Sequence, residues 1–134
     1  MIKLIVGDKG SGKTKMMIDM INESAQTISG SIVCIEKGMK STYNIKSSVR
    51  IIDVDDYAIK GYDAFFGFFM GVLAGNYDIE EVYVDGILKI GGQDVDGFAT
   101  LLDRIADLAT ENLKIVFTVS TDLNNLTDGI KKYL

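Results

Sequence analysis

The segment Gly7–Thr14 restricts the fold of this chain more than any other part of its sequence. It reads Gly-Asp-Lys-Gly-Ser-Gly-Lys-Thr and matches the pattern G-x-x-x-x-G-K-(S/T) at every fixed position. By chance, a chain of this length contains such a match on the order of one percent of the time. The apolar run Ile2–Val6 precedes the match, and apolar residues at helical spacing follow it. The segment therefore predicts a loop between a strand and a helix, the context that the pattern requires.

The residue types in this loop are those that binding a phosphate needs. Glycines allow a tight bend and let several backbone N–H groups approach an anion. Lys13 would bring positive charge to the β- and γ-phosphates, and Thr14 would offer a hydroxyl to Mg²⁺. The following helix would point the positive end of its dipole at the same anion. A flexible glycine turn is the alternative. We expect ATP or another nucleoside triphosphate to bind at Gly7, Asp8, Lys9, Gly10, Ser11, Gly12, Lys13, Thr14 and Lys15.

Apolar runs alternate with helical patterns along the rest of the chain. The expected strands are Ile2–Val6, Ile32–Ile35, Arg50–Val54, Val82–Val84 and Leu113–Val119. The expected helices are Lys13 to about Ser24 (with Met16, Met17, Met20 and Ile21 on one side), part of Tyr57–Gly75, a stretch containing Leu101, Leu102, Ile105, Leu108 and Ala109, and a short helix near Leu123–Tyr133. This alternation predicts an α/β fold with a mostly parallel sheet of about five strands, covered on both faces. The 134 residues suit a single domain, 1–134.

A nucleotide site of this kind also needs a carboxylate near Mg²⁺. Asp85 directly follows the apolar run Val82–Val84. In parallel sheets, ligands bind beyond the carboxyl ends of the strands, which is where Asp85 would lie. We expect Thr14 and Asp85 to hold Mg²⁺, directly or through water. The alternative for Asp85 is a turn residue before Gly86.

Taken in order, these pieces resemble the RecA-like core of the P-loop ATPases, whose fold also underlies the thymidine-kinase type of nucleoside kinase. The matching pieces are Gly7–Thr14, the strand Ile32–Ile35 followed by Glu36, the segment Val82–Asp85 and the final strand Lys114–Thr121. The resemblance covers most of the chain in layout, and only the phosphate loop is specific in residues. It implies a three-layer P-loop NTPase domain with ATP and Mg²⁺ as cofactors.

The resemblance also indicates where catalytic groups would lie. Many relatives carry a catalytic glutamate directly after the metal aspartate, but this chain has Gly86 there. In RecA-like proteins the base can instead end the strand that follows the phosphate-loop helix. Glu36 occupies that place, so Glu36 and Lys13 are the expected catalytic residues. The alternative for Glu36 is an ion pair with Lys37 or Lys40 in a surface loop.

Two further features of the site follow from the resemblance and from the chemistry of phosphoryl transfer. Relatives place a polar residue that senses the γ-phosphate at the end of the last strand, and Ser120 or Thr121 would fill that role. Transition-state charge would also require an arginine. The chain has only Arg50 and Arg104, and Arg104 fits a solvated helix face.

Composition limits the partners and the compartment. The formal net charge of -5 does not support loose binding to nucleic acid, which usually needs a basic face. Histidine is absent and Cys34 is the only cysteine, so metal sites would use oxygen ligands and Cys34 is expected to be a buried, inert thiol. The apolar stretch Ala64–Gly75 is shorter than the ~20 residues that span a bilayer. We expect a cytoplasmic protein that does not enter a membrane.

Glycines recur at positions 67, 71 and 75 of an otherwise apolar segment. On a helix, Gly67, Gly71 and Gly75 would form a smooth groove at a cost of ~1 kcal/mol each relative to alanine. We expect tight packing of this helix on the sheet to offset that cost. The alternative is a homo-oligomer or protein-partner interface through this helix.

Three functions remain compatible with the sequence. The preferred one is a small RecA-like, Mg²⁺-dependent ATPase. A kinase that moves the γ-phosphate to a nucleoside or small metabolite is the first alternative, and a non-catalytic, nucleotide-gated partner-binding module is the second. Nothing in the sequence selects adenine over guanine.

Overall fold

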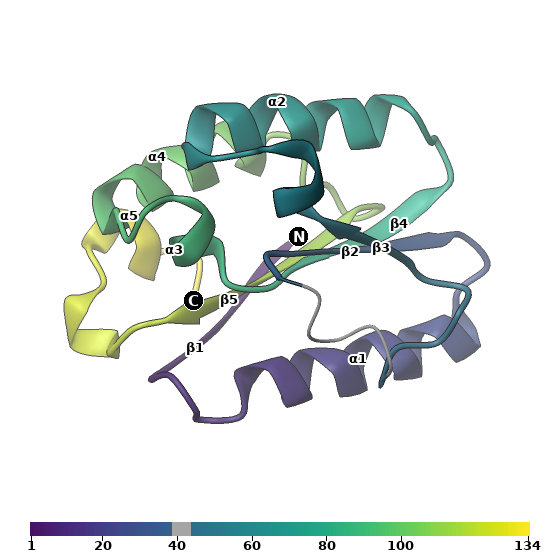
Figure 1. Cartoon of the computed structure of the whole chain (residues 1–134), viewed down its shortest axis with the longest axis horizontal. Coiled ribbons are helices and arrows are strands. Elements are labelled where there is room, and N and C mark those ends of the chain that lie inside the picture. The colour runs from purple at the N-terminus through teal and green to yellow at the C-terminus, as the bar shows by residue number, and fades with distance from the viewer. Residues whose placement is uncertain (39–43) are drawn as a thin grey trace.

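A computed structural model describes residues 1–38 and 44–134 of the chain (Figure 1). Its five strands form one sheet in the order β1-β5-β4-β2-β3, and every neighbouring pair is parallel. The expected α/β class with a five-stranded parallel sheet is therefore confirmed. The strands are β1 (Ile2–Gly7), β2 (Ser31–Glu36), β3 (Arg50–Asp53), β4 (Ile79–Val84) and β5 (Lys114–Ser120).

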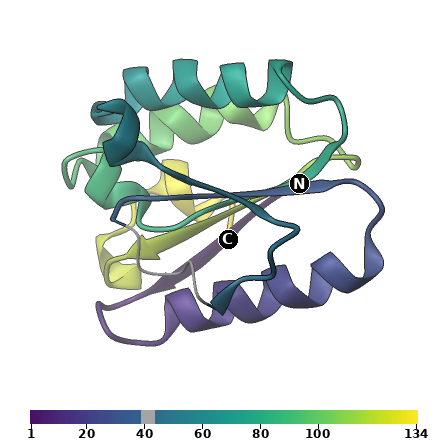
Figure 2. The same ribbon diagram turned by 45° about the vertical axis from the view of Figure 1, so that its right-hand side comes forward.

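Helices cover both faces of the sheet. The turned view shows α1 on one side, with α2 and α4 packed on the other (Figure 2). Each helix expected from the sequence is present, and α3 is an additional short helix that the sequence did not predict, because a single turn is too short to show a period. The helices are α1 (Lys13–Thr27), α2 (Gly61–Ala74), α3 (Ile87–Ile90), α4 (Val95–Ala106) and α5 (Asp128–Lys131), with 3₁₀ turns at Val54–Tyr57 and Leu123–Asn125.

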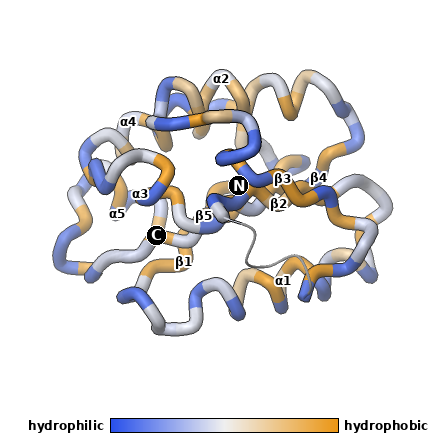
Figure 3. The backbone as a smooth tube through the Cα atoms, in the orientation of Figure 1, coloured by the Kyte–Doolittle hydropathy of each residue, from blue (hydrophilic) through white to orange (hydrophobic). Residues whose placement is uncertain are grey.

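The strands divide their side chains between two apolar layers. Successive residues of a strand point to opposite faces, so Cys34, Tyr83 and Val116 belong to the core beneath α1. Their neighbours Val84 and Phe117 belong to the core beneath the other helices. The apolar residues accordingly concentrate in the strands at the centre of the molecule (Figure 3). This burial on both faces explains why the strands read as continuous apolar runs in the sequence.

The order of the strands determines what can meet at the carboxyl edge of the sheet. Strand β5 lies between β1, which leads into the Gly7–Thr14 loop, and β4, which leads into Asp85. Two strand spacings, or about 10 Å, therefore separate β1 from β4. Side chains from α1 and from β5 must bridge this gap if the loop and Asp85 form one site.

Two residues expected on the apolar faces of α1 and α4 are exposed to solvent. Met16 is 55% exposed, whereas Met17, Ile18 and Ile21 are buried. Met16 lies one residue, or about 100° of helical rotation, before Met17, and this turns it out of the contact with the sheet. In α4, the helix ends at Ala106, so the 37%-exposed Leu108 lies beyond its buried face.

The glycines of α2 do not pack on the sheet. A Cβ atom added at Gly67 or Gly71 would meet nothing within 4 Å, so both residues face open space. Gly75 ends the helix, and its N–H donates to the Gly71 carbonyl. Phe65 and Phe69 make the buried contact instead. The spacing of residues along a helix indicates a periodic stripe, but it does not show which stripe faces the core. An interface with a second protomer or a partner stays a prediction.

Across the described ranges, no helix has the length and apolarity that crossing a bilayer requires.

Replacing Phe98 by alanine tests the core that supports β5. The Phe98 ring is fully buried on α4 and meets the edge of the Phe117 ring, with centroids 5.5 Å apart. We expect Phe98→Ala to lower the free energy of unfolding in urea by about 3–5 kcal/mol, because it leaves a cavity. Tyr77→Ala, at a side chain that is 98% exposed, should change it by less than about 0.5 kcal/mol. Equal effects of the two substitutions would contradict this packing.

Candidate functional site

The Gly7–Thr14 loop has a backbone that only glycine adopts readily. Gly10 has a φ of 84° and Gly12 a φ of 91°, both in the left-handed region. At Gly7 an added Cβ would come 2.5 Å from the Ser11 Oγ, because the loop folds back over the end of β1. The Ser11 N–H donates to the Asp8 carbonyl at 3.1 Å, which closes this turn. The fixed glycines of the pattern are thus explained by local conformation and by a close approach.

Lys13 lies within this loop although it begins α1. Its side chain is buried, and its Nζ donates to the Asp8 carbonyl at 2.8 Å. Among the described residues, no side chain caps the start of α1 and no acidic residue stands in its first turn. The first N–H groups of a helix have no partner within the helix, so together with the Lys13 ammonium they make this end of α1 electropositive. Lys15 differs, since its ammonium is exposed and pairs with Asp19 at 3.0 Å.

Asp85 lies where the sequence predicts it, directly after β4 and facing α1. The Thr14 hydroxyl is 3.3 Å from its Oδ1 and 3.2 Å from its Oδ2. Thr14 and Asp85 are 71 positions apart in the chain. The structure therefore brings together the hydroxyl and the carboxylate that the sequence nominated as Mg²⁺ ligands.

A third side chain in this cluster, Thr118, was missed by the sequence reasoning. Its hydroxyl lies 2.6 Å from Asp85 Oδ1 and 2.8 Å from the Gly86 nitrogen, and the residue is only 1% exposed. It projects from β5, the strand that fills the gap between β1 and β4. The available signal was a single hydroxyl within the apolar run Ile115–Val119, but threonine is also an ordinary strand former.

The two residues proposed as phosphate sensors lie beside the loop. Ser120 pairs with Gly7 in the parallel register of β5 and β1, and the Thr121 N–H donates to the Gly7 carbonyl at 3.1 Å. Ser120 is exposed and Thr121 is half-buried. Their position agrees with the expectation, while their role stays a prediction.

Glu36 ends β2 next to Asp85. Ile35 of β2 pairs with Val84 of β4, and the Asp85 N–H donates to the Ile35 carbonyl at 2.9 Å. Glu36 and Asp85 therefore each come directly after one member of this pair. Glu36 is only 2% exposed, which does not fit a surface loop. Burial first, and then the charges of Glu36 and Asp85, raise the pKa of the Cys34 thiol, two residues before Glu36 on the same face. Cys34 is thus the buried thiol that the sequence predicts, and it lies near both carboxylates.

Of the basic residues nominated outside the loop and α1, the structure describes Lys37 and the two arginines. Lys37 Nζ pairs with the Asp55 carboxylate at 2.6 Å, and Lys40 lies outside the described residues. Arg104 pairs with Asp63 at 3.0 Å and lies over the Phe66 ring. Arg50 is exposed at the amino-terminal start of β3, away from the carboxyl edge. Neither arginine belongs to the cluster around Asp85.

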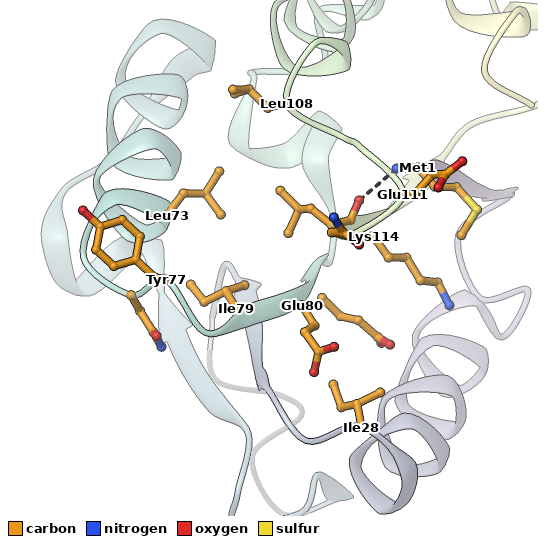
Figure 4. Close-up of a pocket in the computed structure, with 13 residues that line it drawn as sticks. Met1, Ile28, Leu73, Tyr77, Ile79, Glu80, Leu108, Glu111 and Lys114 are labelled. Atoms are coloured by element: carbon orange, nitrogen blue, oxygen red, sulfur yellow. Dashed lines mark hydrogen bonds between the residues drawn. The ribbon is translucent and has the colours of Figure 1, made fainter.

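A cavity of about 740 Å³ lies at the opposite, amino-terminal edge of the sheet (Figure 4). Figure 4 shows Leu73 and Tyr77 on one side of it, with Glu111 and Lys114 on the other. None of the residues nominated from the sequence lines it. Because parallel sheets bind ligands beyond the carboxyl ends of their strands, and because α1 begins at the other edge, the loop and not this cavity is the candidate nucleotide site.

A scan against protein-family models finds no match, and a search of curated proteins finds none either. The site is therefore defined by its own geometry. A hydroxyl and a carboxylate that face each other are oxygen donors of the kind that Mg²⁺ takes.

Two identical substitutions with opposite expected signs test the loop conformation. Gly12→Ala should lower the free energy of unfolding by about 1–2 kcal/mol, because alanine resists the left-handed conformation that Gly12 adopts. Gly67→Ala lies in a helix beside open space, and it should raise that free energy by up to about 1 kcal/mol. Urea denaturation of both variants measures the difference, and shifts of the same sign would refute the assigned conformations.

Proposed function

We propose that this chain binds a nucleoside triphosphate, most simply ATP, with Mg²⁺ and hydrolyses it as a small RecA-like ATPase. The observation that carries the proposal is the contact between Thr14, at the start of α1, and Asp85, at the end of β4. A chance glycine turn would have no reason to sit beside a carboxylate from a distant strand. The full match of Gly7–Thr14 to the phosphate-loop pattern and the electropositive start of α1 give further support.

In this proposal the loop and Lys13 bind the phosphates. The backbone N–H groups between Gly7 and Thr14 and the start of α1 supply neutral donors, and the Lys13 ammonium supplies charge-assisted ones. Lys13 would exchange the Asp8 carbonyl, its present acceptor, for phosphate oxygens. Thr14 and Asp85 would hold Mg²⁺, which would neutralise charge that develops on the transferring phosphoryl group.

We assign the activation of water in this proposal to Glu36. It is buried at the end of β2, beside Asp85. As a carboxylate it would accept a proton from a water molecule whose oxygen bonds to the γ-phosphorus. The bond from that phosphorus to the β,γ-bridging oxygen breaks, and ADP and inorganic phosphate leave. Ser120 and Thr121, next to Gly7, would contact the γ-phosphate.

A second candidate function is a nucleotide-gated binding module with no turnover of its own. Two observations favour it. The position after Asp85 is Gly86, with a φ of 76°, and not a glutamate. Within residues 1–38 and 44–134, no arginine lies at the carboxyl edge to stabilise transition-state charge. Tight triphosphate binding by a purified protein that releases no phosphate would favour this module over the ATPase.

Lys13→Ala tests the binding part of the proposal. Loss of a charge-assisted bond to phosphate costs about 2–3 kcal/mol, so we expect affinity for Mg-ATP to fall on the order of 100-fold in calorimetry. The matched control is Lys3→Ala, at an exposed lysine on β1, which should keep the wild-type affinity. An unchanged affinity in Lys13→Ala, with the fold intact, would remove the phosphate-loop assignment.

Glu36→Gln tests the hydrolytic part. The amide cannot accept the proton from water, so phosphate release should slow by about 100-fold or more while Mg-ATP affinity stays near wild type. Glu23→Gln, at an exposed position on α1, is the control and should turn over normally. If Glu36→Gln releases phosphate at the wild-type rate, the base is another residue.

A further inference from the structure

The Thr118 hydroxyl is the most constrained polar group near Asp85. It projects from β5 into the α1 side of the sheet, is 1% exposed, and has polar neighbours on two sides. One neighbour is the Asp85 carboxylate and the other is the backbone nitrogen of Gly86. Because the residue is buried, water cannot readily replace either contact.

The direction of the two hydrogen bonds is fixed by chemistry. A backbone N–H can only donate, so the Thr118 oxygen must accept from Gly86. The single proton of the Thr118 hydroxyl is then left for Asp85 Oδ1, which it reaches at 2.6 Å. A charge-assisted O–H···O⁻ bond typically has this length. Thr118 therefore holds Asp85 as an acceptor and fixes the rotation of its carboxylate.

The contact from Thr14 is of a different kind. Its hydroxyl is shared between the two carboxylate oxygens at 3.2 and 3.3 Å, distances typical of a weaker bond. Thr14 is also less buried than Thr118. Thr14 can thus change its partner at little cost, whereas Thr118 is committed to Asp85 and Gly86.

We propose that Thr118 is a positioning residue that orients Asp85 for Mg²⁺, an inference that rests on the proposed triphosphate site. The strong bond to Oδ1 anchors one side of the carboxylate and leaves Oδ2 with only the weaker contact from Thr14, the other nominated ligand. Side chains that hold metal-binding carboxylates in this way commonly change metal affinity about 10- to 100-fold when they are lost. Thr118 touches neither nucleotide nor metal in this account, and it acts only through Asp85 and Gly86.

The test compares ATP affinity with and without Mg²⁺, measured by calorimetry on the whole chain. Thr118→Val keeps the shape of the side chain and removes the hydroxyl. We expect its ATP affinity in EDTA to stay within about twofold of wild type, and the gain in affinity on adding Mg²⁺ to shrink by about 10- to 100-fold. Thr118→Ser, which restores the hydroxyl, should recover most of that gain. Thr100→Val, at an exposed threonine of α4, is the matched control.

A double-mutant cycle separates positioning from general damage. In an Asp85→Ala background, Thr118→Val should have no further effect on the Mg²⁺-dependent gain, because its route to the metal is already gone. Binding of Mn²⁺ to the ATP complex, followed by electron paramagnetic resonance, gives a readout that does not depend on turnover. A cooperative urea transition for each variant verifies that it is folded.

The outcomes distinguish this inference from the function on which it rests. An undiminished Mg²⁺ effect in Thr118→Val would overturn the positioning role and leave the triphosphate site standing. Equal losses of affinity in EDTA and in Mg²⁺, or failure of Thr118→Ser to recover, would show that Thr118 is only a structural residue. If wild-type protein does not bind ATP under either condition, the proposed function and this inference both fall.

Discussion

The hydrogen bonds around Asp85 join the three elements that make the candidate site. Thr14 reaches this carboxylate from α1, and Thr118 reaches it from β5. The gap between β1 and β4, about two strand spacings wide, is thereby spanned by short polar side chains. Because Gly86 also donates to Thr118, the start of α3 is tied to the same cluster. A substitution at Asp85 would therefore also disturb the start of α3, the helix that follows it.

The parallel topology explains why these groups meet at one edge and why the other edge is different. All five strands run the same way, so the phosphate-type loop, Asp85, Glu36 and Ser120 gather where the strands end. The helix α1 adds the positive end of its dipole at the same place. The amino-terminal edge holds an open cavity with Tyr77 at its rim, but neither the Gly7–Thr14 loop nor the start of α1 lies there. Charge and direction, and not cavity volume, distinguish the two edges.

The parts of this account that the sequence predicts are those encoded by local patterns. The Gly7–Thr14 loop, the apolar strands and the acidic residue after β4 each follow from residue types at fixed spacing. Thr118 could not be predicted, since its role depends on β5 lying between β1 and β4, and strand order comes from long-range pairing. The outward face of Gly67 and Gly71 was misjudged for a related reason. The helical period in a sequence shows which residues share one face of the helix. Tertiary packing determines which of these faces is buried in the core.

The most direct test of the central claim is to map where a triphosphate binds by amide chemical shifts in ¹⁵N-labelled protein titrated with ATP and Mg²⁺. The account predicts that the largest shifts occur between Gly7 and Lys15 and at Asp85 and Gly86, since these backbone groups surround the proposed phosphates and metal. Amides lining the opposite cavity, such as those of Tyr77 and Leu108, should stay unshifted. Shifts confined to that cavity, or no shifts at millimolar ATP, would contradict a nucleotide site at the carboxyl edge of the sheet.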